Sequence, residues 1–193
     1  MSVFQLYLSL GLSHIADIQG YDHILFILAL CGVYVLKQWK HVLILITAFT
    51  LGHSLTLVLA TFNIISIPSS LIELLIPITI LITATGNIVY KKVEFSKKLH
   101  VFKYFTALFF GLIHGLGFSN YLRSLLLQEQ DLIMPLFAFN VGIELGQVLI
   151  VLGILFIAEL FVHLFHSNRR EWNLVISGMA LGISLILIIE RWP

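Results

Sequence analysis

Residues 132–165 read LIMPLFAFNVGIELGQVLIVLGILFIAELFVHLF, and this stretch decides the fold class. A helix needs about 20 mostly apolar residues to cross a lipid bilayer. The stretch is longer than that, so a helix built from it must tilt, kink or extend past the membrane. Its apolar residues do not alternate with polar ones, as they do in the strands of a membrane β-barrel. The stretch therefore predicts a transmembrane helix.

The composition extends this interpretation to the whole chain. Of the 193 residues, 59% are hydrophobic and only 11% are charged, whereas a soluble domain has about 25% charged and about 45–50% apolar residues. A soluble fold of this size could not bury so much apolar surface, which excludes a cytosolic enzyme, a secreted module and a disordered chain. Lys and Arg number 11 against 10 Asp and Glu, so the chain has no basic field for nucleic acid.

The sequence therefore predicts an all-α fold, a polytopic transmembrane helical bundle that forms a single domain over residues 1–193. The predicted spans lie at about 22–36, 41–62, 68–90, 101–122, 132–165 and 172–190. Residues 3–15 are too short and too polar for a clear span, and they lack the basic start and small-residue cleavage site of a signal peptide. They predict a half-inserted or re-entrant helix, with a seventh span as the alternative.

Lysine and arginine residues gather in alternate loops, which predicts the orientation. Cytoplasmic loops are enriched in these residues. In this chain, nine of the 11 lie in or beside the loops after the first, third and fifth spans: Lys37, Lys40, Lys91, Lys92, Lys97, Lys98, Lys103, Arg169 and Arg170. These loops are predicted to face the cytoplasm, which leaves Arg123, Arg191 and the C-terminus on the outer side.

Three pairs of glycines are spaced four residues apart. They are Gly111 with Gly115, Gly142 with Gly146, and Gly178 with Gly182. Glycines at this spacing let the backbones of two membrane helices approach closely. The pairs predict close helix packing at three places.

Ionisable side chains within the spans are the main indication of function. Each costs about 2.5–3.5 kcal/mol to insert, so it needs a partner, a cavity or a function. With the predicted orientation, several such side chains share the outer half of the membrane. The candidate metal ligands are His14, Asp22, His23, His53, Glu73, His114 and Glu144. Imidazole and carboxylate groups are ligands for nickel, cobalt, zinc, copper and iron. The single cysteine, Cys31, excludes an intramolecular disulfide and a cysteine-rich metal site.

Each candidate also has a structural interpretation. A lone intramembrane histidine such as His53 is often held by a hydrogen bond between helices, and Asp22 is a favourable residue to cap a helix. Glu73 could be a protonated packing group. Glu144 shares one helix face with Asn140 and Gln147, a pattern that also fits a polar seam between two helices. The metal hypothesis rests on the prediction that all these side chains lie at a similar depth in the membrane.

The stretch HIADIQGYDHILFILAL, residues 14–30, resembles the first signature block of the HupE/UreJ family of bacterial membrane proteins. The matching positions are His14, Gly20, Asp22 and His23. Four later stretches agree as well: FTLGHSLTL (49–57), IELLIP (72–77), FFGLIHGLGFSNYL (109–122) and FNVGIELGQ (139–147). The resemblance covers about residues 11–150. It implies a bacterial inner-membrane protein that moves nickel or cobalt, with ligands at the seven candidate positions.

The leading hypothesis is a permease that captures a divalent metal ion from the outer side and passes it inward. The metal is nickel, cobalt or zinc, and the other partner is the lipid bilayer. The chain contains no nucleotide-binding motif, so movement is expected to follow the gradient or the membrane potential. An intramembrane zinc-dependent hydrolase is the alternative, and a metal sensor or chaperone is a third hypothesis. The sequence leaves open the metal and whether the chain forms a homo-oligomer.

Overall fold

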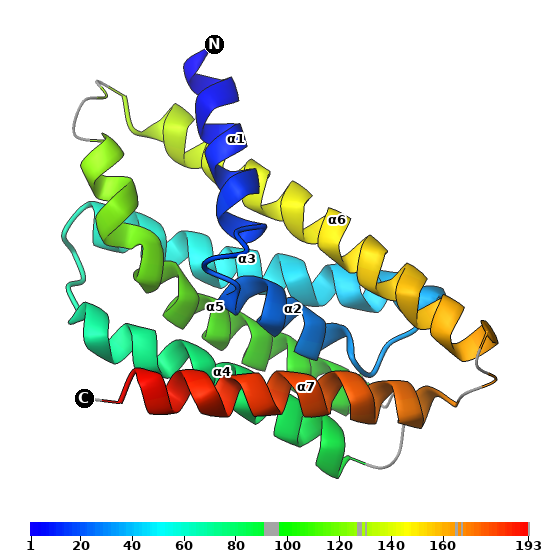
Figure 1. Cartoon of the computed structure of the whole chain (residues 1–193). Helices are drawn as coiled ribbons and strands as arrows, with labels where there is room; N and C mark the ends of the chain where they lie inside the picture. Colours follow the sequence, from blue (N-terminus) through cyan, green and yellow to red (C-terminus); the bar gives the residue numbers. More distant parts are fainter. Residues whose placement is uncertain (91–96, 127–128, 130, 165, 167, 193) are drawn as a thin grey trace.

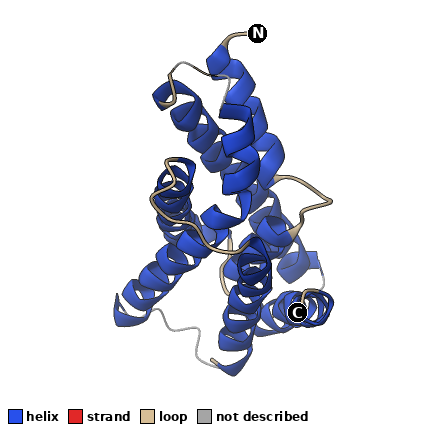
Figure 2. Cartoon of the chain, turned by 90° about the vertical axis from the view of Figure 1, so that its left-hand side faces the viewer, coloured by secondary structure: helices blue, strands red, loops and turns tan. Residues whose placement is uncertain are grey.

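The structure is a computed structural model that describes residues 1–90, 97–126, 129, 131–164, 166 and 168–192 (Figure 1). In these residues the regular structure is entirely helical, with no strand, so the prediction of a helical bundle is confirmed (Figure 2). The elements are α1 (Val3–Ile15), α2 (Asp22–Cys31), the 3-10 helix η1 (Leu36–Gln38), α3 (Trp39–Thr61), α4 (Ser69–Val89), α5 (Lys97–Leu126), α6 (Ile133–Leu164) and α7 (Arg169–Glu190).

Five helices, α3 to α7, are long and apolar enough to cross a membrane, and they match five of the six predicted spans. The first predicted span, 22–36, differs from the others. Its helix, α2, has 10 residues and is therefore about 15 Å long at 1.5 Å per residue. Helix α1 has 13 residues, also fewer than a span requires, in keeping with a half-inserted helix.

Glycines let two pairs of helices cross with their backbones in contact. Helix α3 packs along α5, and α1 packs against the first part of α6 (Figure 1). A Cβ atom added at Gly111 would lie 2.1 Å from the backbone oxygen of Phe49, and one at Gly142 would lie 2.3 Å from that of Leu8. No side chain fits at these distances, so two of the three predicted glycine contacts are confirmed.

The third glycine pair, on α7, does not form a packing contact in the described part of the chain. A Cβ atom at Gly178 or Gly182 would meet nothing within 4 Å. The reason is the orientation of α7, which packs on α4 and buries Ser177, Ala180 and Ser184 instead. The prediction of close packing at Gly178 and Gly182 is therefore wrong within this chain.

The two ends of the bundle differ in character. At one end α3, α5 and α7 finish and α2, α4 and α6 begin; we call it the C-terminal side. The opposite end, the basic side, carries Lys37, Lys40, Arg169 and Arg170. Lys91 and Lys92, from the same predicted set, lie outside the described residues.

Arg191 joins three elements at the C-terminal side. Pro77 lies inside α4, and because proline has no N–H, the carbonyl oxygen of Glu73 loses its helical partner. Arg191 supplies a substitute, since its Nη1 donates a hydrogen bond to that oxygen at 3.1 Å. Its Nη2 pairs with Oδ2 of Asp22 at 3.1 Å. The end of α7 is thereby fixed to α4 and to the start of α2.

Side-chain amides hold the short α2 inside the bundle. Nδ2 of Asn87, on α4, donates to the carbonyl oxygen of Ala29 on α2 at 2.7 Å. Nδ2 of Asn173, on α7, donates in turn to the carbonyl oxygen of Asn87 at 2.8 Å. These hydrogen bonds tie α2, α4 and α7 together, which fixes the depth of the residues at the start of α2.

Candidate metal centre

Four histidines from four helices meet below the C-terminal side of the bundle. We call His14 of α1, His23 of α2, His53 of α3 and His114 of α5 the histidine cluster. The ring centroid of His23 lies 4.6 Å from that of His14, 5.6 Å from that of His53 and 5.2 Å from that of His114. The centroids of His14 and His53 are 5.9 Å apart. The structure thus brings together four of the seven predicted ligands.

The close helix crossings place these rings. A Cβ atom at Gly115 would lie 2.2 Å from the backbone oxygen of His53, so the turns of α3 and α5 that carry His53 and His114 are in direct contact. Helix α1 reaches the same depth because Gly11 lies against the backbone of Phe139 on α6.

Three of the four histidines are buried and His14 is half-buried, and most of the ring nitrogens of the cluster have no partner. His53 and His114 are 0% exposed, and His23 is 6% exposed. Both ring nitrogens of His53, Nδ1 of His114, and Nε2 of His14 and His23 are buried without a hydrogen bond. Leaving a buried polar group unsatisfied costs about 1–3 kcal/mol. A group of unsatisfied imidazole nitrogens in one place is the donor set that a transition-metal ion would satisfy.

One hydrogen bond fixes the tautomer of His114. Oγ1 of Thr79 donates its only proton to the carbonyl oxygen of Ile76 at 2.7 Å. The same oxygen lies 2.9 Å from Nε2 of His114, so it must accept a proton from that nitrogen. A neutral His114 therefore carries its lone pair on Nδ1, the nitrogen that has no partner. Such an outer hydrogen bond is the usual way to orient a metal-binding imidazole.

Aromatic rings enclose the cluster. The ring of Phe118 lies 3.8 Å from that of His14, centroid to centroid. On the basic side of the cluster, Phe26 lies 5.1 Å from His114 and stacks on Phe49 at 4.7 Å. Phe49 itself lies 5.0 Å from His114. These rings separate the histidines from the basic half of the bundle.

A cavity of about 260 Å³ connects the cluster to the C-terminal side. His14, His23 and His114 form its inner wall, together with Phe118. Its other charged lining residues are Asp17, Asp22, Glu73 and Arg191. Two predicted ligands, Asp22 and Glu73, thus lie at the cavity rather than inside the cluster. Oδ1 of Asp22 is buried and has no hydrogen bond.

Glu144, the seventh predicted ligand, lies elsewhere. It is on α6, and its Oε1 accepts a hydrogen bond from Thr47 of α3 at 2.6 Å. Gln147 accepts from Thr50 at 2.9 Å, and Asn140 bonds to Ser54. These pairs form a polar seam between α3 and α6, which was the alternative to a metal-binding role for Glu144. Glu144 does not line the cavity.

As the side chains stand, no three His, Cys, Asp or Glu residues among those described form a group that could hold a metal ion. Three of the four imidazoles, those of His14, His23 and His114, line the cavity, and the nitrogens of the cluster do not converge on one centre.

Several residues at the site were not among the predicted ligands, and for two of them the sequence held a signal. Phe118 follows His114 by four residues, so helical periodicity could have placed it beside the cluster. Arg191 is one of only two basic residues on the side predicted to face outward, which could have suggested a pairing with a carboxylate there.

The fold and the site define a multi-pass helical membrane protein with imidazoles buried beneath a cavity that is lined by carboxylates. A family model described as HupE / UreJ protein matches residues 1–191, so the chain belongs to the HupE/UreJ family. Membership relates the chain to the transport of nickel or cobalt at a membrane. No curated protein and no solved structure shows significant similarity to the chain.

Proposed function

We propose that the protein is a permease for a divalent transition metal of the nickel and cobalt type in the bacterial inner membrane. The single observation that supports this most strongly is the histidine cluster, with its buried and unpartnered nitrogens at the base of a cavity lined by carboxylates. The acidic lining attracts a cation, and the imidazoles replace part of its water shell.

The spacing of the rings fits a shared ion. With metal–nitrogen bonds of about 2.0–2.1 Å, imidazole rings bound to one tetrahedral ion lie roughly 5 Å apart, centre to centre. The ring centroid of His23 lies 4.6–5.6 Å from the ring centroids of its three neighbours in the cluster. The proposal therefore requires the side chains to rotate on binding, because their nitrogens do not converge on one point as they stand.

The route begins at the cavity. Asp22 and Glu73 meet the cation first, and His14 and His23 pass it to His53 and His114. Arg191, paired with Asp22, reduces the negative charge there, so the cavity attracts the ion without holding it permanently. With the basic side in the cytoplasm, the membrane potential favours inward movement by about 2.3 kcal/mol per charge per 100 mV.

Flux of radiolabelled nickel into proteoliposomes tests the proposal. His23→Ala and His114→Ala each remove a ligand, and loss of an outer partner alone costs about 10–100-fold in metal affinity, so uptake should fall at least that far. His163→Ala is the matched control, because that histidine is on α6, is largely exposed and pairs only with Glu159 among the described residues. Uptake by both cluster variants at the wild-type rate would overturn the proposal.

A zinc-dependent intramembrane hydrolase is a second candidate, and one observation favours it. Phe26 and Phe49 lie directly on the basic side of the cluster, where a permeation path has to continue. A bound zinc ion supplies an activated water for hydrolysis. Elemental analysis of the purified protein, together with the flux assay, separates the two: one tightly held zinc ion per chain and no flux would support the hydrolase.

A further inference from the structure

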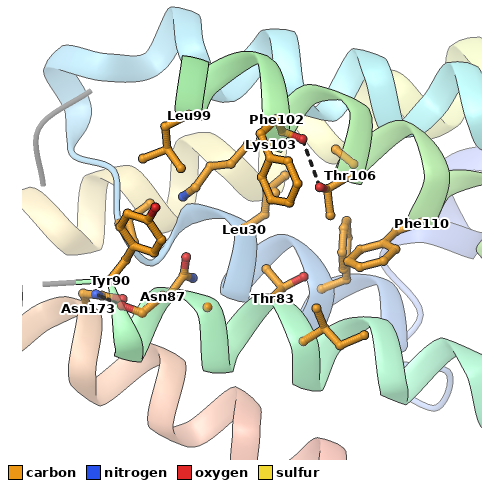
Figure 3. Close-up of a pocket in the computed structure, with 15 residues that line it drawn as sticks. Leu30, Thr83, Asn87, Tyr90, Leu99, Phe102, Lys103, Thr106, Phe110 and Asn173 are labelled. Carbon is orange, nitrogen blue, oxygen red and sulfur yellow. Dashed lines mark hydrogen bonds between the residues drawn. The ribbon is translucent and has the colours of Figure 1, made fainter. Parts of the chain in front are cut away.

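A second cavity lies in the basic half of the bundle, apart from the histidine cluster (Figure 3). Its volume is about 230 Å³, and α2, α4, α5 and α7 all contribute to its walls. We call it the lysine crevice, after Lys103. Its residues are Phe26, Leu30, Val33, Ile82, Thr83, Gly86, Asn87, Tyr90, Leu99, Phe102, Lys103, Thr106, Ala107, Phe110 and Asn173.

The crevice opens toward the surroundings of the bundle. At its rim, Ile82 is 53% exposed, Tyr90 61% and Phe102 68%. These residues lie on or at the end of α4 and α5, two of the helices long enough to span a membrane. The medium at the opening is therefore lipid, and the mostly apolar wall suits an acyl chain.

One cation faces this apolar space. The side chain of Lys103 points into the crevice (Figure 3), with its Nζ 5.3 Å from the centre of the Tyr34 ring. Among the described residues, no carboxylate pairs with it. Arg170 adds a second positive charge at the same end, where it donates hydrogen bonds to the backbone oxygens of Asn87 and Tyr90. Such charges near the basic interface favour an anionic headgroup.

We propose that the lysine crevice binds an anionic phospholipid, with one acyl chain between α4 and α5 and the headgroup phosphate beside Lys103. The proposal does not depend on metal transport. An ammonium group repels a divalent cation, so the crevice is poorly suited to the metal itself.

The chain offers two variants that test the site from opposite directions. Lys103→Gln removes the charge and leaves the apolar wall intact. Gly86→Leu is designed to fill the crevice: Gly86 lines it, and a Cβ atom added there meets nothing within 4 Å, so the new side chain has open space at its base.

Each variant has a matched control. Lys40→Gln removes another lysine at the basic side that also lies over an aromatic ring, 5.6 Å from the centre of Trp39, but outside the crevice. Gly178→Leu adds a side chain at an exposed glycine of α7 that also has open space around it.

The experiment is a titration of the delipidated protein in detergent with phosphatidylglycerol, phosphatidylcholine or oleate, with bound lipid counted by native mass spectrometry. Size-exclusion chromatography checks that each variant is folded. Lys103→Gln should weaken binding of phosphatidylglycerol about fivefold and leave phosphatidylcholine unchanged, the effect of one basic residue beside an anionic lipid. Gly86→Leu should abolish binding of both phospholipids, and the controls should match the wild type.

Two results would overturn the proposal. One is equal binding of phosphatidylglycerol by Lys103→Gln and Lys40→Gln, or by Gly86→Leu and Gly178→Leu. The other is displacement of phosphatidylglycerol by equimolar oleate, which would show that the ligand is a free fatty acid.

Discussion

At the scale of single residues, the groups around each imidazole decide what the histidine cluster can bind. Thr79 is the clearest case, because its hydroxyl gives its proton to Ile76 and leaves only an acceptor for His114. The partner therefore selects the nitrogen that remains available. His53, by contrast, has no hydrogen bond at either ring nitrogen, so its orientation can adapt to an ion.

Replacing Thr79 with valine should weaken nickel binding. The isosteric side chain keeps the packing of α4 against α5 but removes the acceptor that orients His114. Loss of such an outer partner costs about 10–100-fold in metal affinity. Equilibrium dialysis with nickel measures this directly. Thr61→Val is the control, since the hydroxyl of Thr61 is also buried but bonds to the backbone of its own helix at Leu57; equal affinities in the two variants would contradict this role of Thr79.

The four histidines were predictable, but their surroundings were not. Ionisable groups inside a membrane protein are costly, so His53 and His114 stand out from the sequence alone. The role of Thr79 depends on which face α4 turns toward α5, and no local pattern specifies that. For Glu144 the sequence left two interpretations open, and the choice depended on whether its helix face met the cavity or met Thr47 on α3.

At the scale of helices, the crossing of α3 and α5 builds half of the cluster. Gly52 and Gly111 remove the side chains that would keep the two backbones apart. His53 and His114 are thereby brought level with each other. A change at this crossing should therefore affect both the stability of the protein and the site.

Gly111→Ala should destabilise the protein. The added methyl group would lie 2.1 Å from the backbone oxygen of Phe49, which cannot move away without displacing α3. Such overpacking costs about 1–3 kcal/mol. Thermal unfolding in detergent should show a lower Tm. In Gly178→Ala the methyl group meets open space, and alanine is the better helix former by about 1 kcal/mol, so its Tm should be unchanged or higher. A Tm for Gly111→Ala equal to that of Gly178→Ala would refute the close crossing.

Hydropathy predicted the positions of the helices in the sequence better than it predicted their lengths. The apolar run at 22–36 is shorter than the roughly 20 residues that a crossing needs, and its helix stops after Cys31. The structure shows why this is tolerated: Asn87 and Asn173 provide specific polar contacts that hold α2 in place. The spacing of Gly178 and Gly182 did not predict the packing of α7 either. A glycine pair does not reveal which face of a helix has a neighbour.

At the scale of the whole molecule, charge divides the two sides. The cavity with Asp17, Asp22 and Glu73 opens at the C-terminal side, and the lysine crevice lies in the other half. A permease that takes up cations needs the acidic opening to face the metal source, and basic residues near the opposite interface suit the anionic cytoplasmic leaflet. Both functional proposals therefore fit the same orientation.

Single cysteines test this orientation. Cys31 is buried, so a Cys31→Ser background removes the only native thiol. In that background, Ser66→Cys introduces an exposed thiol in the loop between α3 and α4 at the C-terminal side, and Lys40→Cys introduces one at the basic side. In intact spheroplasts, a membrane-impermeant maleimide should label Ser66→Cys and not Lys40→Cys, because basic loops stay in the cytoplasm. Both variants should be labelled once the membrane is opened, which shows that each thiol is reactive. The reverse pattern in intact spheroplasts would place the acidic cavity toward the cytoplasm and turn the proposed uptake into export.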